Sequence, residues 1–172
     1  MKEESVFNKV DIFYFTGTGN SLNVSRWFAS VASEMGVANQ LFDLSKIRRN
    51  DPIKLEKNSL IGFCSPTHGF NFPPVTIKFL LRFPKGNNKV FIMNTRAGIK
   101  LWKIHLVGLS GIAQLFAWLI LKIKGYKIVG MRPVDLPSNW ISVHPVLRKK
   151  VLISIFSRCE RNTKKFARKI LS

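Results

Sequence analysis

The stretch YFTGTGNS, residues 14–21, changes abruptly from apolar to small polar side chains. The apolar run before it, 10–15, is typical of a strand, and the spacing after residue 20 is typical of a helix. Glycines permit a tight turn, and a helix N-terminus offers unpaired N–H groups and a positive dipole. Residues 16–21 therefore form a candidate phosphate-binding loop, although an ordinary glycine-rich turn with a Ser or Asn cap fits equally well.

The spacing of the glycines narrows the choice of phosphate. The nucleoside-triphosphate pattern G-x-x-x-x-G-K-[ST] is absent. The dinucleotide pattern G-x-G-x-x-G begins at Gly17 and Gly19, but Leu22 occupies its third glycine position. Asp43 could serve as a ribose-binding acid, so NAD remains a weaker alternative. A terminal monophosphate needs only the hydroxyl-rich loop.

Strand-like and helix-like patterns alternate along the chain. The predicted strands span 10–15, 37–44, 60–65, 89–94 and 126–134, and the predicted helices span 20–35, 75–83, 109–124 and 145–171. This order predicts a doubly wound parallel α/β sheet with helices on both faces. Residues 46–57 form a charged connection, and residues 95–105 fit neither pattern.

Polar stretches follow three of these strands. They are residues 16–21, 65–74 and 94–98. In open parallel sheets, ligands bind outside the carboxyl ends of the strands. We therefore expect these three segments to converge on one edge of the sheet.

The composition limits the class of protein. The 172 residues suit a single domain, 1–172, and 46% of them are hydrophobic, enough for a packed core. The net charge of +19 favours anionic partners. Two distant cysteines, Cys64 and Cys159, make neither a disulfide framework nor a zinc or iron–sulfur site. His105 and His144 have no partners at metal-ligand spacing.

Residues 106–121, LVGLSGIAQLFAWLIL, carry no formal charge. A membrane-spanning helix needs about 20 apolar residues, and this segment is shorter and contains Ser110 and Gln114. A buried core helix is the better interpretation. The N-terminus shows no secretion signal, so we expect a cytoplasmic protein, with at most peripheral contact at the inner face of the membrane.

YFTGTGNS resembles the phosphate loop of flavodoxins, in particular of the flavodoxin half of flavodoxin–ferredoxin fusion proteins of bacteria and archaea. The resemblance continues with CSPTHGFNFPP at 64–74, NTRAG at 94–98 and KGYKIVGMRPVDLPSNWISVHP at 124–145. It implies a flavodoxin-like sandwich whose five-stranded parallel sheet has the order 2-1-3-4-5. It also implies bound FMN and a role in electron transfer between a reduced donor and a redox partner.

The resemblance assigns an FMN site residue by residue. Gly17 would make the turn of the phosphate loop, and the phosphate would lie on Thr16, Thr18, Gly19, Asn20 and Ser21. The flavin ring would lie between two segments: Pro66, Thr67, His68, Gly69 and Phe70 on one side, and Asn94, Thr95, Arg96, Ala97 and Gly98 on the other.

Three details of this site stay open. Flavodoxins usually stack an aromatic side chain on the flavin, and the candidates are first Phe70, then His68 and Phe72. The partner aromatic after the fourth strand is missing, and Trp102 or Trp140 could replace it. His68 is either a hydrogen-bond partner of the flavin or a surface residue, and Arg96 either approaches the flavin or pairs with a carboxylate.

Two departures from the family concern partners. The cysteine-rich ferredoxin half is absent from this sequence, and flavodoxins are usually acidic whereas this chain is basic. We therefore expect a separate redox partner, such as a ferredoxin or an acidic reductase. The positive charge near Arg96 would raise the flavin potential above that of acidic flavodoxins. An alternative function is a basic adaptor or membrane-surface protein that has lost its flavin.

Residues 148–169 carry nine Lys or Arg and one acid, Glu160, interspersed with apolar residues. These charges are expected to be the solvated face of the last helix. The competing interpretation is a basic amphipathic surface for anionic lipid or an acidic partner. Nucleic-acid binding is not expected, because no known module is present and the aromatic residues lie at core-like positions.

Overall fold

The computed structural model of the chain describes residues 6–101, 104–106, 112–137 and 149–172. Its elements, in chain order, are β1 (Lys9–Tyr14), α1 (Asn20–Glu34), β2 (Ala38–Asp43), β3 (Ser59–Pro66), α2 (Pro74–Arg82), β4 (Lys89–Leu101), β5 (Ile104–Leu106), α3 (Ala113–Ile123), β6 (Lys127–Pro137) and α4 (Lys149–Leu171). The predicted helical segments 109–111 and 145–148 lie outside the described residues, as do Trp102 and Trp140.

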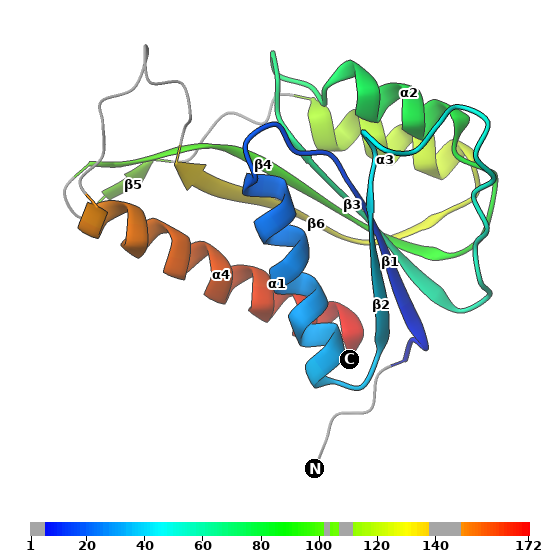
Figure 1. Cartoon of the computed structure of the whole chain (residues 1–172), viewed down its shortest axis with the longest axis horizontal. Helices are drawn as coiled ribbons and strands as arrows, with labels where there is room; N and C mark the ends of the chain where they lie inside the picture. The colour runs from blue at the N-terminus through cyan, green and yellow to red at the C-terminus, as the bar shows by residue number, and fades with distance from the viewer. Residues whose placement is uncertain (1–5, 102–103, 107–111, 138–148) are drawn as a thin grey trace.

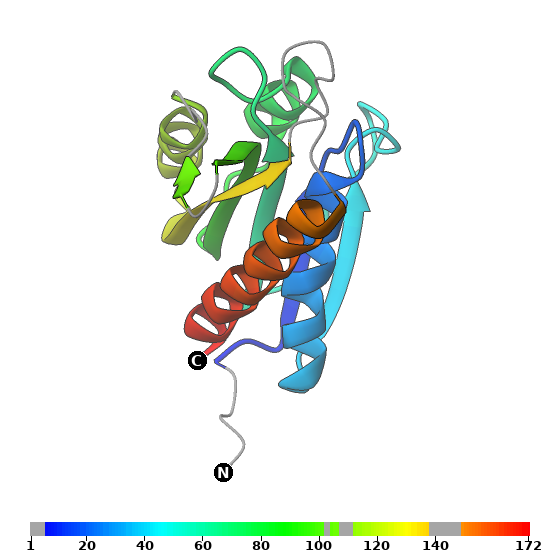
Figure 2. The same ribbon diagram turned by 90° about the vertical axis from the view of Figure 1, so that its left-hand side faces the viewer.

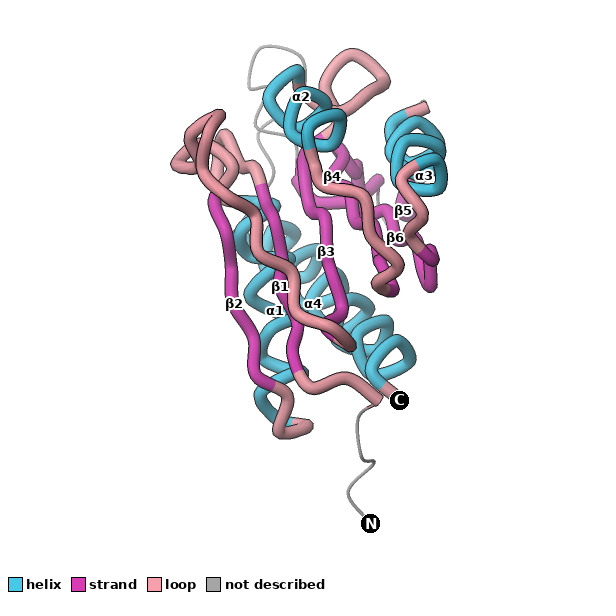
Figure 3. The backbone as a smooth tube through the Cα atoms, turned by 90° about the vertical axis from the view of Figure 1, so that its right-hand side faces the viewer, coloured by secondary structure: helices cyan, strands magenta, loops and turns pink. Residues whose placement is uncertain are grey.

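Five parallel strands form the sheet, in the order β2-β1-β3-β4-β6 (Figures 1 and 3). The fifth strand predicted from the sequence is β6, so the predicted order 2-1-3-4-5 is confirmed. The short β5 pairs antiparallel with the end of β4. It lies beyond the part of β4 that is paired with β3.

The fourth strand is longer than predicted. The predicted strand ends at residue 94 and residues 95–105 fit neither pattern, but β4 continues to Leu101 and pairs with β6 as far as Gly98 opposite Pro137. Because β6 pairs only with β4, it can accommodate Pro133 and Pro137, which cannot donate to a second neighbouring strand. The two strands together extend past the ends of β1 and β3 (Figure 1).

Two helices cover each face of the sheet: α1 and α4 on one, α2 and α3 on the other (Figures 1 and 2). The connection between β2 and β3, residues 44–58, contains no helix. Its apolar residues Ile47, Ile53 and Leu55 pack against the α2–α3 side of the core. This loop therefore covers the part of the face that α2 does not reach.

On the α1–α4 side, the rings of Phe28 and Phe91 stack at 4.1 Å between centroids. Phe166 of α4 packs edge-on against both. The Phe91 ring lies on its neighbour in the sheet, Gly62, where an added Cβ would overlap it. Gly130 in β6 leaves room for Phe166 in the same way. The two glycines in the sheet thus leave space for these aromatic rings.

On the α2–α3 side, four phenylalanines form a second aromatic cluster. Centroid distances between 5.1 and 6.4 Å connect Phe13, Phe63, Phe79 and Phe83. Phe13 also stacks on Phe42 of β2 at 4.9 Å. The central strands are therefore buried on both faces, as their continuous apolar sequences predict.

The apolar helix is only half buried. α3 covers its face of the core with Ala113, Ala117, Ile120 and Leu121, but Leu115 and Leu119 on its outer side are exposed. The expectation of a buried core helix therefore holds for the inner side alone. In the described part of the chain, no helix is long and apolar enough to span a membrane.

Both cysteines are buried and reduced. Burial raises the pKa of the Cys64 thiol to about 12 and that of the Cys159 thiol to about 11. The Cys64 thiol donates to the carbonyl of Ser21 at 3.4 Å, and the Cys159 thiol donates to the carbonyl of Asp135 at 3.1 Å. Both side chains act as small core residues.

Gly62→Ala should destabilise the protein by about 1–3 kcal/mol, because the new methyl group forces the Phe91 ring out of its stack with Phe28. Chemical denaturation measures this loss. In a double-mutant cycle, Phe91→Leu should relieve part of the strain, so the combined loss should be smaller than the sum of the two single losses. Additive losses would show that the ring does not depend on Gly62.

Neither thiol should react with a thiol reagent in the native protein at neutral pH, because the reactive thiolate is almost absent at these pKa values. Both should react after unfolding in guanidinium chloride, where the pKa returns to its ordinary value. A colorimetric thiol assay with and without denaturant measures this. Rapid reaction of a native thiol would contradict the burial of that side chain.

Candidate functional site

A cavity of about 200 Å³ lies at the carboxyl edge of the sheet. It is lined by Thr16, Gly17, Thr18, Asn20, Ser21, Pro66, Thr67, His68, Thr95, Arg96, Ala97 and Pro137. All three predicted segments contribute to this lining. Five of the predicted site residues do not line it: Gly19, Gly69, Phe70, Asn94 and Gly98.

Gly19 makes the turn between β1 and the start of α1. Its φ of +89° lies in the left-handed region that favours glycine, and its N–H donates to Thr16 Oγ1 at 2.9 Å. Gly19 caps α1 without a side-chain hydrogen bond, and the first turn of the helix carries no acidic residue. The first N–H groups of a helix have no intrahelical acceptor. This end of α1 therefore has the donors and the dipole that suit an anion.

Side chains at the start of α1 form hydrogen bonds with β4 and β6. Ser21 Oγ and Thr95 Oγ1 are buried and lie 2.9 Å apart in a hydrogen bond. Asn20 Nδ2 donates to the carbonyl of Pro137 at 3.3 Å. The hydroxyl of Ser21, predicted to contact a phosphate, thus connects α1 to β4. Pro137 was not predicted, since its position after the predicted strand 126–134 gave no sign that β6 continues to the cavity.

The segment after β3 is fastened to β4 in the same region. The Thr67 N–H donates to the carbonyl of Thr95 at 2.8 Å, and Asn94 Nδ2 donates to Thr67 Oγ1 at 2.7 Å. The Asn94 side chain is fully buried. Asn94 therefore supports the wall of the cavity from behind.

Residues 68–71 form a tight turn in which His68 and Asn71 exchange two backbone hydrogen bonds. Its central residues have positive φ, +52° at Gly69 and +64° at Phe70. Such a φ is unusual for a bulky side chain and is common at functional sites. Phe70 is 59% exposed at the tip of the turn.

The three aromatic candidates for stacking are thus separated. His68 lines the cavity, Phe70 stands outside it, and Phe72 is buried among the side chains of the α2–α3 side. The burial of Phe72 leaves it no face to offer a ligand. Among the described residues of the cavity lining, His68 is the sole aromatic ring.

Arg96 pairs with a carboxylate. Its Nε lies 2.6 Å from Asp135 Oδ1, and a second N–H donates to Oδ2 at 3.2 Å. Bidentate pairs of this kind fix the relative orientation of the guanidinium and the carboxylate. Arg96 also lines the cavity. Because it is paired with Asp135, a ligand there would experience the positive charge of Arg96 partly offset by the negative charge of Asp135.

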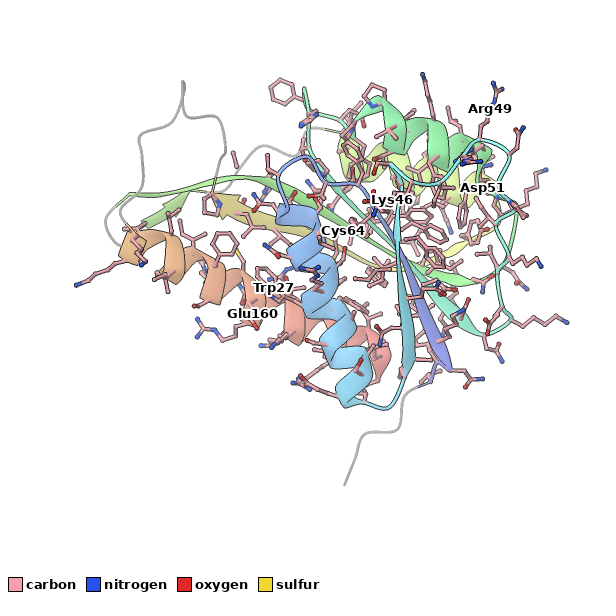
Figure 4. The ribbon with its side chains drawn as sticks, in the orientation of Figure 1. Trp27, Lys46, Arg49, Asp51, Cys64 and Glu160 are labelled. Atoms are coloured by element: carbon pink, nitrogen blue, oxygen red, sulfur yellow. The ribbon has the colours of Figure 1, made fainter. Side chains whose placement is uncertain are left out.

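Cys64 lies beside the beginning of α1 (Figure 4), with its thiol on the backbone of Ser21. Its residue pairs in the sheet are Tyr14 and Met93. It therefore supports the loop from below, and its protonated thiol is unsuited to redox chemistry at neutral pH. In the described part of the chain, no group of three or more His, Cys, Asp or Glu side chains is placed to hold a metal ion.

A larger cavity, about 840 Å³, lies between the β2–β3 connection and α2. Arg49 stands at its rim (Figure 4). None of the predicted site residues lines it.

A scan against models of known protein families finds no match for the sequence, and a search of curated proteins finds none either. Solved structures do resemble it. A flavodoxin from the domain Archaea matches with a TM-score of 0.59 and 14% identity over 94% of this chain and 98% of its own. A flavodoxin from Streptococcus pneumoniae TIGR4 matches with a TM-score of 0.61 and 13% identity over 94% of this chain and 99% of its own.

An azoreductase from Bacillus anthracis matches with a TM-score of 0.63 and 12% identity, over 95% of this chain and 100% of its own. At these identities the likeness concerns the fold. The matches cover nearly the whole length of both chains. This agrees with the strand order of the sheet described above. The chain therefore has the flavodoxin-like fold.

Proposed function

We propose that this chain is an FMN-binding electron-transfer protein, which passes electrons between a reduced donor and a separate redox partner. The observation that carries the proposal is the N-terminus of α1, which has no side-chain cap and lies at a cavity that residues of β3, β4 and β6 complete. Flavodoxins and an azoreductase share the fold. The sequence resemblance to the flavodoxin half of fusion proteins supports the same cofactor.

The residues present fit the phosphate end of FMN. The loop supplies backbone N–H groups at the start of α1 and the side chains of Thr16, Thr18 and Asn20. No acidic side chain lines the cavity in the described part of the chain. The nearby carboxylate of Asp135 is paired with Arg96, which reduces its repulsion of a phosphate.

The flavin end would lie between the segments of His68 and Arg96. Bound FMN would supply transfer of one or two electrons. The protein's part is to hold the cofactor and to set its electrostatic surroundings. His68 would stack on the ring or donate a hydrogen bond to it, and Phe70, two residues further along the turn, is exposed outside the cavity.

The charge of the chain bears on the redox partner. With a net charge of +19, docking would favour an acidic surface such as that of a ferredoxin or an acidic reductase. Most of the charge on α4 is solvated, and its apolar side packs on α1 and β6. α4 can therefore contribute steering charge to a partner while its apolar side stays in the core.

Thr18→Asp should weaken FMN binding at least about tenfold, because a carboxylate at this exposed loop position repels the phosphate at short range. Riboflavin, which has no phosphate, should bind the parent and the variant equally. Quenching of flavin fluorescence on titration measures both affinities. Asn87→Asp adds the same charge on the α2–β4 connection, at the amino end of the sheet, and should leave FMN binding unchanged.

Absence of FMN quenching by the parent protein would refute the proposed cofactor. The chain would then be better described by the alternative, a basic adaptor that has the fold without the flavin. Equal loss of FMN and riboflavin binding in Thr18→Asp would mean that the loop does not hold the phosphate. Steady oxidation of NADPH by the FMN-loaded protein alone would make it an oxidoreductase instead of a carrier.

The Arg96–Asp135 pair should tune the potential of the bound flavin. Asp135→Asn should raise the midpoint potential by roughly tens of millivolts, because it removes a negative charge near a cofactor that becomes more negative on reduction. Arg96→Gln should lower it by a similar amount. Spectroelectrochemistry measures both shifts, and equal potentials in the two variants would show that the pair is too far from the flavin to act on it.

A further inference from the structure

The outer side of α3 is largely apolar, and Lys122 is the one charged residue exposed on the helix. The exposed apolar side chains, which we call the α3 face, are Ile112, Leu115, Trp118, Leu119 and Ile123. Leu115 is 60% exposed and Ile123 is 73% exposed. Their spacing of three and four residues places them on one side of the helix. A continuous apolar surface of this kind usually marks a binding surface.

The segment that contains α2 and α3 is basic. Residues 57–134 contain nine lysines and three arginines but no Asp or Glu. Lys122 lies exposed on α3 itself, and Lys78 lies exposed on the neighbouring α2. An anionic surface would therefore meet attractive side-chain charges on both helices.

α2 lies beside α3 and is joined to it. Leu81 is 56% exposed on α2, and its side chain lines the cavity between α2 and the β2–β3 connection. Lys124, just past the end of α3, donates to the carbonyls of Leu81 and Phe83 at 2.8 and 2.6 Å. The amine thus joins the C-terminal ends of the two helices. Figure 3 shows them side by side on one face of the sheet.

We propose that the α3 face is the surface by which this protein docks on an anionic lipid membrane. Helices that lie in the membrane interface combine Leu, Ile and Trp on one side with Lys and Arg beside them. Trp118 suits the headgroup level, where its ring is buried and its N–H remains hydrated. Each nearby Lys or Arg adds attraction to anionic lipid.

Lipid fits this surface better than a protein partner does. Specific protein interfaces carry about one hydrogen bond per 100–200 Å², whereas the side chains of the α3 face offer only the indole N–H of Trp118. A symmetric contact between two copies of the α3 face would bring the two Lys122 side chains together, and neither α2 nor α3 carries an acid to pair with them. A bilayer requires only apolar area and positive charge.

The α3 face continues to the rim of the candidate site. The Ile112 N–H donates to the carbonyl of Phe70 at 2.9 Å, and Phe70 is itself exposed. Docking on the α3 face would therefore bring the turn 68–71 close to the lipid headgroups. If the proposed function holds, a lipid-soluble electron acceptor could then reach the flavin; docking itself does not depend on the flavin.

Vesicle flotation tests the docking surface. The parent protein should float with vesicles of phosphatidylcholine and phosphatidylglycerol and much less with phosphatidylcholine alone. The double variant Leu115→Gln/Leu119→Gln should lose at least about tenfold in partition coefficient, because two aliphatic side chains no longer enter the interface. Ile153→Gln, the same change at a 56% exposed position on α4, should float like the parent.

Equal flotation of the double variant and the parent would overturn the proposal, as would failure of the parent to float with anionic vesicles. A parent that stays off vesicles and elutes as a dimer, with a monomeric double variant, would make the α3 face a self-association surface and also overturn it. Quenching of tryptophan emission by brominated lipids gives a second test, and Trp118→Phe should remove much of it. None of these measurements involves FMN, so their failure is separable from failure of the proposed function.

Discussion

The candidate site depends on the parallel register of β1, β3 and β4. Tyr14 pairs in register with Cys64, and Cys64 pairs in register with Met93. The residues that follow on the three strands therefore lie side by side at the carboxyl edge of the sheet. The loop after β1, the segment after β3 and the extension of β4 must then meet. The buried pair of Ser21 and Thr95 and the contact of Thr67 with Thr95 are possible only because of this register. A slip of one residue would separate all of them.

The register in turn depends on how the two faces of the sheet are filled. Phe91 can lie flat against the sheet only because Gly62 beside it has no side chain, and its ring then supports Phe28 in the middle of α1. On the other face Phe13 contacts aromatic rings from β2, β3 and α2. Packing on both faces thus fixes the depth of α1, and with it the position of its N-terminus at the cavity.

Much of the fold was predictable because strands covered on both faces have continuous apolar sequences, and because Gly36 and Gly125 follow the ends of α1 and α3. The convergence of three polar segments followed from the rule for parallel sheets. The extension of β4 was not predictable, because NTRAG is polar and its strand conformation comes from pairing with β6. The role of Ser21 as a link to Thr95, and the choice of Asp135 as partner of Arg96, also require contacts between residues distant in sequence.

The fold itself does not demand the apolar residues on the outside of α3. The inner side of that helix, with Ala113, Ala117, Ile120 and Leu121, completes the core. Polar residues at Leu115 and Leu119 would cost the core nothing and would improve solubility. Their apolar character therefore needs a cause outside the fold. Because the backbone at the start of α3 is bonded to Phe70, a contact on that helix would bear directly on the turn that carries His68. One backbone hydrogen bond thus connects the residue before α3 to the turn beside the cavity.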